Sequence, residues 1–309
     1  MSTVREAAAE YLGLRRSTGY KYYVEGLLIG HFTDFLEDRG LEHVTVEAAL
    51  EWAAMPPDAD PAWHSSRLTA VRGLIRHLAA SDGRHQVPPP GLLPRRGHRV
   101  TPYLYSPEEI AGLVHAARSM AHPLRAAVFE HFVALMAVTG LRTGEAMALD
   151  RDDADLDAGV LTVRGAKFGK SRLVPLRPDV TARLREYARR RAELCPRPAV
   201  PAFFVSGTGT RLNHHNVSTT FNALLAAAGI SAPPGVPKPR PYDLRHSFAV
   251  ATVARWYAEG QDVAHHLPAL STYMGHVSPA STYWYLHSCP RLMSAAAQRL
   301  EDAWKEEAP

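Results

Sequence analysis

The first candidate for chemistry in this chain is a tyrosine that follows a histidine at a short distance. His276 precedes Tyr285 by nine residues within the segment 274–287. A phenolic oxygen can act as a nucleophile when neighbouring groups activate it. Tyr283 and Trp284 adjoin Tyr285, however, and a run of aromatic residues is more often part of a core than of an active site. His276 and Tyr285 therefore indicate an active site only if other residues of the chain support the same chemistry.

Two arginines in short apolar contexts are such residues. Residues 139–145 read ThrGlyLeuArgThrGlyGlu and contain Arg142, and residues 242–248 read TyrAspLeuArgHisSerPhe and contain Arg245. Planar guanidinium groups bind phosphate oxygens bidentately and stabilise the charge that develops on them in a dry site. These residue types fit the attack of a protein nucleophile on a phosphodiester.

In type, order and spacing, these residues resemble the tyrosine recombinases of the phage integrase class. Members of that family carry an arginine, a hairpin lysine, a HisxxArg box and a GlyHis segment that ends in the nucleophilic tyrosine. The resemblance covers roughly residues 100–295 strongly and the first 95 weakly. It implies a DNA strand transferase that cuts with tyrosine, keeps the bond energy in a phosphotyrosyl link, and rejoins the end to a different strand.

The resemblance also implies a role for each matching residue. The implied catalytic residues are Arg142, Lys167, Tyr242, Arg245, His276 and Tyr285. The two arginines and His276 hold the phosphate, while Lys167 protonates the leaving 5′ oxygen. Glu145 takes the position of the family's acidic residue and orients Arg142. Tyr285 is favoured over Tyr283 by its spacing from the histidine and because Tyr283 lies about 200° away around a helix.

The lysines stand in the segment 167–176, which reads LysPheGlyLysSerArgLeuValProLeu. A lysine on a turn is usually only solvated, so the assignment of Lys167 depends on the family pattern. Lys170 and Arg172 are expected to contact DNA. The same stretch suggests a phosphate-binding P-loop, but it has three residues between its glycines where four are needed, and it lies on a hairpin with no following helix. We therefore expect no nucleotide cofactor.

Position 242 departs from the family pattern, in which the HisxxArg box begins with histidine or lysine. Tyr242 can donate a hydrogen bond to a phosphate oxygen, but a phenol is a poor general base at neutral pH. The proton of the nucleophile then passes through water or directly to the phosphate. His246 lies on a different helical face from Arg245 and is expected to pack rather than to substitute.

The composition permits a DNA partner without requiring one. The formal net charge is +4, the pI is about 9.1, and 46% hydrophobic residues among 309 favour two globular domains. Cys195 and Cys289 show no CysxxCys spacing, and the histidines lack metal-ligand spacing, so neither a disulfide nor a metal site is expected. No apolar run approaches the roughly 20 residues that span a bilayer, and no signal peptide is visible. We expect a cytoplasmic protein, associated with the nucleoid when it is bound to DNA.

Residues 1–88 predict a helical DNA-binding domain of about four helices. Bulky residues recur at three-and-four spacing from Val24 until Gly40 ends the pattern, Thr45 can cap a second helix, and Ser65 or Ser66 can begin another. Three arginines lie off the apolar stripe of that last helix, where they can meet phosphates or remain solvated. They are Arg67, Arg72 and Arg76.

The proline-rich residues 89–102 predict a linker, and residues 103–309 a catalytic domain with a C-terminal helix. In this domain, Ser106 begins a capping box, 124–138 reads as a buried helix, and 160–163 with 172–176 alternate as hairpin strands. Further helices are expected near 178–194, 214–228, 243–258, 267–274, 279–287 and 291–305. The predicted fold is mainly α with a small antiparallel β-sheet.

The expected partner is double-stranded DNA at specific recombination sites, without a membrane or a small-molecule substrate. The resemblance implies a homo-tetramer on two paired sites, exchanging strands through a Holliday junction, and it favours the simpler two-domain recombinases, including transposon-borne ones. Residues 291–309 are amphipathic; they fold back on their own domain or, as the resemblance implies, dock on a neighbouring subunit. Two alternatives stay open: a type IB topoisomerase, which religates the same strand, and an accessory protein that kept the fold but lost catalysis.

Overall fold

The computed structural model describes residues 3–19, 22–94, 101–165 and 171–276. The chain forms two compact units, Met1–Arg99 and Val100–Pro309. Each unit is described by itself below. The expected linker begins within the first unit, and its residues 95–100 lie outside the described residues.

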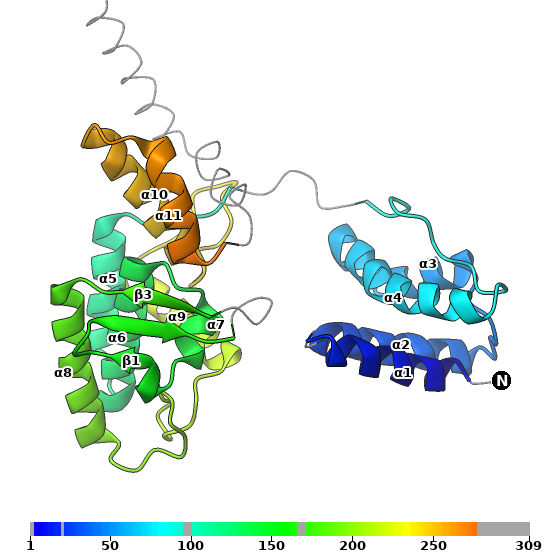
Figure 1. Cartoon of the computed structure of the whole chain (residues 1–309), viewed down its shortest axis with the longest axis horizontal. Helices are drawn as coiled ribbons and strands as arrows, with labels where there is room; N and C mark the ends of the chain where they lie inside the picture. Colours follow the sequence, from blue (N-terminus) through cyan, green and yellow to red (C-terminus); the bar gives the residue numbers. More distant parts are fainter. Residues whose placement is uncertain (1–2, 20–21, 95–100, 166–170, 277–309) are drawn as a thin grey trace, which may run out of the picture. The chain divides into compact units, whose positions relative to one another are not determined.

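The described part of the first unit consists of helices, drawn in blue to cyan in Figure 1: α1 Val4–Ser17, α2 Tyr23–Asp38, α3 Val46–Ala54 and α4 Pro61–Ser81. Thr45 caps α3 as predicted, because its hydroxyl accepts the Ala48 backbone N–H at 3.1 Å. The predicted start of α4 at Ser65 or Ser66 is wrong. Asp60 caps this helix through the Ala62 N–H at 2.7 Å, and Pro61 occupies the first helical position, where no backbone N–H is needed.

The core of the first unit lies between α2, α3 and α4. Phe32 and Trp52 pack edge to face with their ring centroids 5.0 Å apart, and both side chains are buried. Helix α4 contributes the four residues that the sequence predicts to face inward, all of which are buried: Leu68, Val71, Ile75 and Leu78. Leu74 of the same helix is buried as well. Their spacing of three and four residues turns one face of the helix towards the core.

The second unit contains a larger set of elements. In chain order, those that precede and include the sheet are α5 Pro107–Arg118, α6 Pro123–Thr139, α7 Thr143–Ala148, the 3-10 turn η1 Arg151–Asp153, β1 Ala154–Asp155, β2 Val160–Val163 and β3 Arg172–Pro175. The helices that follow are α8 Pro178–Leu194, α9 His214–Ala227, α10 Asp243–Ala258 and α11 Val263–Met274. The predicted class, mainly α with a small antiparallel sheet, is confirmed.

The sheet is antiparallel in the order β1-β2-β3. The predicted hairpin is its β2-β3 pair, with Val160 opposite Pro175 and Val163 opposite Arg172. This register places Arg172 at the first rung of the ladder, next to the hairpin turn. The short strand β1 was not predicted.

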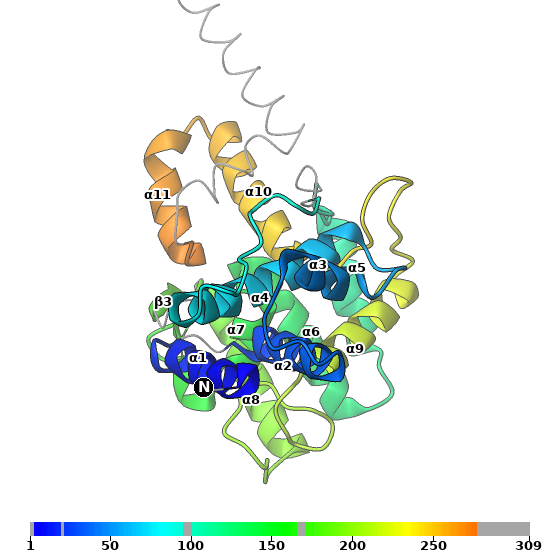
Figure 2. The same ribbon diagram turned by 90° about the vertical axis from the view of Figure 1, so that its right-hand side faces the viewer.

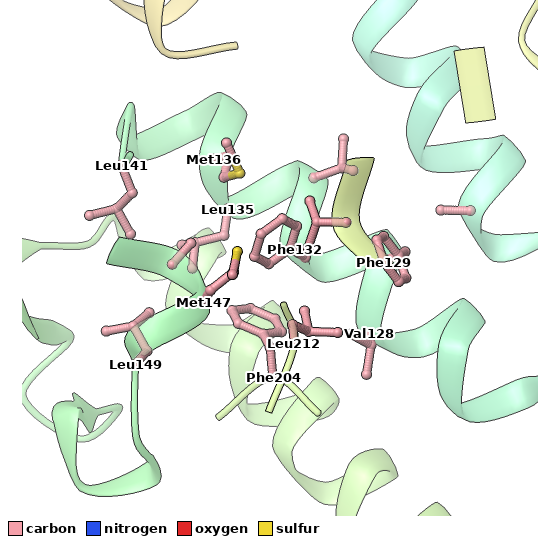
Figure 3. Packing of buried hydrophobic residues seen from close by; sticks show 14 of the residues in the cluster. Val128, Phe129, Phe132, Leu135, Met136, Leu141, Met147, Leu149, Phe204 and Leu212 are labelled. Atoms are coloured by element: carbon pink, nitrogen blue, oxygen red, sulfur yellow. The ribbon is translucent and has the colours of Figure 1, made fainter. Parts of the chain in front are cut away.

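Helix α6 forms the centre of the core of the second unit and is buried on most sides. Figure 3 shows Phe132 and Met136 of this helix facing Met147 and Phe204, which come from α7 and from the segment after α8. The capping box predicted at Ser106 is present, because the Ser106 hydroxyl accepts the Glu109 N–H while the Glu109 carboxylate accepts the Ser106 N–H.

Helices α10 and α11, drawn in gold and orange in Figures 1 and 2, pack against each other as a pair at one end of the second unit. Their contact buries Ala249, Val253, Val263 and Leu267. The predicted start of α11 at residue 267 is wrong: Asp262 caps the helix, which runs through Pro268. The helices expected at 279–287 and 291–305 lie outside the described residues. Within the described ranges, every helix is too short or too polar to cross a bilayer.

Candidate active site

The carboxyl end of α11 is closed by a glycine turn that fixes the backbone of His276. Gly275 adopts a left-handed conformation with φ at 68°, which glycine reaches without strain. Its N–H donates to the Thr272 oxygen at 2.9 Å, and the His276 N–H donates to the Ser271 oxygen at 2.9 Å. This pair of bonds is the Schellman motif, which ends a helix and leaves the next carbonyl oxygens free for other donors.

Three arginines from three separate elements donate to those carbonyl oxygens in succession. Arg172 belongs to β3, Arg245 to α10, and Arg142 to the turn before α7. The three bonds run from Arg172 Nε to the Tyr273 oxygen (2.9 Å), from Arg245 Nη2 to the Met274 oxygen (2.7 Å) and from Arg142 Nη2 to the Gly275 oxygen (2.7 Å). Because a helix carries partial negative charge at its carboxyl end, three cations there also gain electrostatic stabilisation.

Glu145 joins two of these arginines. Its Oε1 accepts from Arg142 Nη1 at 2.6 Å, and its two oxygens accept a bidentate pair of bonds from Arg172 at 3.0 and 2.8 Å. Burial by itself raises the pKa of Glu145, but the hydrogen bonds from Arg172 and from the Arg142 backbone, together with the positive charges, lower it to about 2. Glu145 is therefore ionised at neutral pH and holds Arg142 and Arg172 in fixed orientations.

The position of Arg142 follows from how α6 ends. Gly140 terminates this helix with φ at 62°, and a Cβ built on it would lie 2.5 Å from the Phe248 ring. Only glycine fits both constraints. Arg142 then stands just before α7, where its backbone N–H donates to the Glu145 carboxylate at 3.0 Å.

Arg245 lies in the first turn of α10 and is completely buried, with 0% of its surface exposed. Besides its bond to the Met274 oxygen, its Nη1 donates to the Gly140 oxygen at 2.6 Å. It thus ties the end of α6 to the end of α11. The start of α10 is itself held by the buried Asp243, which pairs with Arg240 at 3.0 Å.

His276 follows the glycine turn directly and is partly buried. Burial, then the charges of Arg245, Arg142 and Arg172, and a smaller contribution from His246, lower the pKa of His276 to about 4. The imidazole is consequently neutral at physiological pH. A neutral imidazole carries one N–H donor, which can bind an anion without adding a charge of its own.

The cluster is rich in positive charge. The guanidinium groups of Arg142, Arg172 and Arg245 all lie close enough to His276 to lower its pKa, and Glu145 is ion-paired with the first two. Such a partly buried, positive site is suited to a phosphate group and to the charge that builds up on it during substitution. Within the described ranges, no cluster of His, Cys, Asp or Glu has the arrangement of a metal site.

The structure therefore brings together Arg142, Glu145, Arg245 and His276, and it adds Arg172 to them. Tyr242 stands at the start of α10 with 40% of its surface exposed, and its ring packs on His246 with centroids 5.0 Å apart. The other predicted site residues, Lys167, Lys170 and Tyr285, lie outside the described residues.

Arg172 differs from the expectation of a DNA contact, since its three side-chain nitrogens bind Glu145 and the Tyr273 oxygen. The sequence contains one signal for this placement, an arginine at the first residue of a strand next to a predicted hairpin turn.

Of the arginines predicted to bind DNA in the first unit, Arg67 requires a correction. Its guanidinium lies over the Trp52 ring, 4.0 Å from the centroid, and donates to the Trp52 oxygen at 2.7 Å. The side chain is buried, and burial lowers its pKa. This position stabilises the contact of α4 with α3 and does not suit a phosphate contact.

Arg72 and Arg76 stay in the proposed DNA-binding set. Arg72 donates to the Pro88 oxygen at 2.9 Å, and Arg76 is exposed. Both line a groove of about 840 Å³ over α1, α2 and α4, which the sequence did not predict. Its lining also includes Arg15 and the hydroxyl residues Ser65, Ser66 and Thr69, together with the acidic Glu25 and Asp60.

Comparisons with known proteins identify the family of this chain. Residues 104–291 match the model of the Phage integrase family. Putative integrase/recombinase y4rB of Sinorhizobium fredii (strain NBRC 101917 / NGR234) is 44% identical over 312 residues, which cover 99% of each chain. Tyrosine recombinase XerC of Azotobacter vinelandii (strain DJ / ATCC BAA-1303) is 31% identical over 72% of this chain and 70% of its own.

A solved structure has a similar fold. The Tn1549 transposon integrase, in complex with transposon right end DNA, superposes with a TM-score of 0.66 over 96% of this chain and 99% of its own, at 18% identity. The family match and the sequence relatives show that the chain belongs to the phage integrase family. It is a site-specific DNA recombinase of the tyrosine type.

Proposed function

We propose that this recombinase cuts and rejoins DNA strands through a 3′-phosphotyrosyl intermediate formed on Tyr285. The phenolic oxygen attacks the scissile phosphorus, and the bond from phosphorus to the 5′ oxygen breaks. Lys167 supplies the proton that turns this oxygen into a free 5′ hydroxyl, while the phenolic proton passes to water or to a phosphate oxygen. The 5′ hydroxyl of another strand then attacks the phosphotyrosyl bond and releases the tyrosine.

The observation that carries this proposal is the convergence of three arginines and a neutral histidine on the end of α11. Arg142 is the most exposed of these arginines and is proposed to donate to a non-bridging phosphate oxygen, with His276 donating to another. Arg245 is proposed to act without contacting the phosphate. Its buried positive charge stabilises the negative transition state, and its hydrogen bonds hold the backbone at Gly140 and Met274.

The direct test is a trapped covalent adduct. A nicked or suicide substrate that loses its 5′ hydroxyl by diffusion should accumulate a denaturant-stable complex of protein and DNA. Tyr285→Phe removes one oxygen atom and should abolish the adduct while DNA binding remains. Tyr283→Phe is the matched control, because it makes the same change two residues away. An adduct from Tyr285→Phe, or its loss from Tyr283→Phe alone, contradicts the assignment.

The assembly is proposed as a homo-tetramer on two paired sites that exchanges strands through a Holliday junction. Such an assembly makes recombination depend on two sites in the same reaction. Mixing two differently sized site-containing fragments should give products of exchanged length and, with Tyr285→Phe, slower-migrating paired complexes without products. Religation of each strand to its own partner only would identify a type IB topoisomerase.

Position 242 favours one second candidate, an accessory protein that binds DNA without cutting it. Tyr242 stands where the family has a histidine or lysine, and its ring contacts His246. If catalysis was lost there, the wild-type protein forms no adduct and Tyr242→His restores it. If Tyr242 donates to phosphate in an active enzyme, Tyr242→Phe slows cleavage modestly and Tyr242→His retains activity.

A further inference from the structure

Arg172 joins Glu145 to the carboxyl end of α11. All three of its side-chain nitrogens have acceptors: Nε donates to the Tyr273 oxygen at 2.9 Å, and Nη1 and Nη2 donate to Glu145 at 3.0 and 2.8 Å. Only 12% of its side chain is exposed. A phosphate contact would therefore require breaking a buried bidentate ion pair.

Gly275 leaves room for this arginine. A Cβ built on Gly275 would lie 2.7 Å from Arg172 Nη1 and 2.9 Å from Arg172 Cζ. Those distances are shorter than real carbon contacts, so the guanidinium lies directly against the α-carbon of the glycine turn. The glycine before His276 is thus required twice, by its positive φ and by the packing of Arg172.

We propose that Arg172 is a positioning residue for strand cleavage. It fixes the end of α11 through Tyr273 and Gly275, which sets the position of His276, and it holds Glu145 so that Glu145 can orient Arg142. Since Arg172 begins β3, it also ties both groups to the hairpin on whose turn the general acid Lys167 is expected. This inference rests on the proposed cleavage mechanism and assigns Arg172 no contact with DNA.

The geometry demands arginine at this position. The planar fork matches the two oxygens of Glu145, and Nε points along the third direction to the Tyr273 oxygen. A lysine ammonium also has three N–H donors, but they radiate from a single nitrogen and cannot reproduce the planar fork to Glu145 together with the separate bond to the Tyr273 oxygen. Arg172→Lys keeps the positive charge but loses the hydrogen-bond geometry with Glu145 and Tyr273. The variant therefore distinguishes a positioning role of Arg172 from an effect of its charge alone.

The test measures DNA affinity and cleavage separately for Arg172→Lys and Arg172→Met. DNA dissociation constants are measured over a range of salt concentrations, and cleavage is measured as a single-turnover rate at saturating suicide substrate. Both variants should bind with the affinity and salt dependence of the wild type and should cleave roughly 100-fold more slowly, the size expected for a small misplacement of catalytic groups. Arg164→Met is the matched control, since Arg164 follows β2 on the same hairpin and is 67% exposed; it should cleave normally.

A phosphate contact predicts a different result. Loss of one such contact lowers the slope of log affinity against log salt by about one and weakens binding to all sequences. If Arg172→Met shows that loss and cleaves at the wild-type rate once saturated, the positioning role is wrong. It is equally wrong if Arg172→Lys is fully active.

Gly275→Ala tests the same contact from the other side, and it remains informative if Arg172→Met fails to fold. The added methyl group must displace the guanidinium, so this variant should also bind DNA and cleave slowly. Combined with Arg172→Lys, it should lose less than the product of the two separate effects, because both changes break one contact, while the strain at φ +68° belongs to Gly275→Ala alone. Independent, multiplying losses would overturn the proposal. Absence of any adduct from the wild type would instead refute the cleavage mechanism itself, so the two failures are distinguishable.

Discussion

Replacing Glu145 by glutamine should destabilise the second unit by an amount that depends on pH. Glu145→Gln keeps the size of the side chain but leaves Arg142 and Arg172 without their counter-charge in a buried site. The pKa of Glu145 falls from 4.5 to about 2 in the folded protein. At about 1.4 kcal/mol per unit, this corresponds to roughly 3 kcal/mol of stability at neutral pH. Breaking a buried ion pair by removing one partner typically costs about 3 to 5 kcal/mol, which agrees.

The sign of the pH dependence follows from the lowered pKa. The stability contributed by ionised Glu145 is fully present above pH 4.5 and is lost as the pH falls towards 2. At pH 7 the variant should melt roughly 6 to 12 °C below the wild type, because a unit of this size shifts by about 2 to 4 °C per kcal/mol. The difference should shrink steadily between pH 4.5 and pH 2.

Calorimetry of the full chain at several pH values measures this difference. The matched control is Asp157→Asn, since Asp157 pairs with Arg185 at 3.2 Å on the surface and should contribute under about 1 kcal/mol. If the Glu145→Gln variant melts within about 2 °C of the wild type at pH 7, the loss of stability is about 1 kcal/mol or less, and the reasoning is refuted. A difference that stays constant down to the lowest pH refutes it as well.

Three further changes test other parts of the structure. Arg67→Met should lower the free energy of unfolding of the first unit, measured in urea, by about 1 to 3 kcal/mol, because the Trp52 oxygen loses its donor; the salt dependence of DNA binding should not change. Arg76→Met should weaken the salt dependence of DNA binding and leave the free energy of unfolding unchanged. Gly140→Ala should destabilise the second unit by at least about 1 kcal/mol, since the positive φ is unfavourable for alanine, and wild-type thermal stability would contradict this. Lys167→Ala should cleave normal DNA slowly and a 5′-bridging phosphorothiolate substrate nearly normally, because sulfur leaves without a proton; equal defects on both substrates would mean that the lysine only positions DNA.

Local sequence signals predicted those elements whose ends are set by neighbouring residues. The capping box at Ser106 and the glycine stop at Gly140 are satisfied by atoms within four residues, so the pattern contains all that is needed. Helix α11 begins at Val263, before the predicted residue 267. Val263 and Leu267 pack against α10, and this tertiary contact outweighs the backbone hydrogen bond that a proline inside a helix cannot make.

The side-chain partners of the arginines were less predictable. The family pattern identified Arg142, Arg245 and His276 as a group, but it did not indicate what Arg172 would bind. For Arg67, helical periodicity gave only the direction of the side chain. Its acceptor, the Trp52 carbonyl, lies 15 residues earlier in the chain and becomes a neighbour only when α3 and α4 pack.

The arginine cluster also constrains when the active site can form during synthesis. Arg142 and Arg172 find their acceptors 133 and 101 residues later in the chain, at Gly275 and Tyr273. Domains can fold while the ribosome is still extending the chain, but contacts of such long range must wait for their second partner. A nascent chain that ends before residue 273 can complete α6, the sheet and α8 while its arginines still lack these backbone acceptors. Assembly of the phosphate site is thereby postponed until nearly the whole protein has been made.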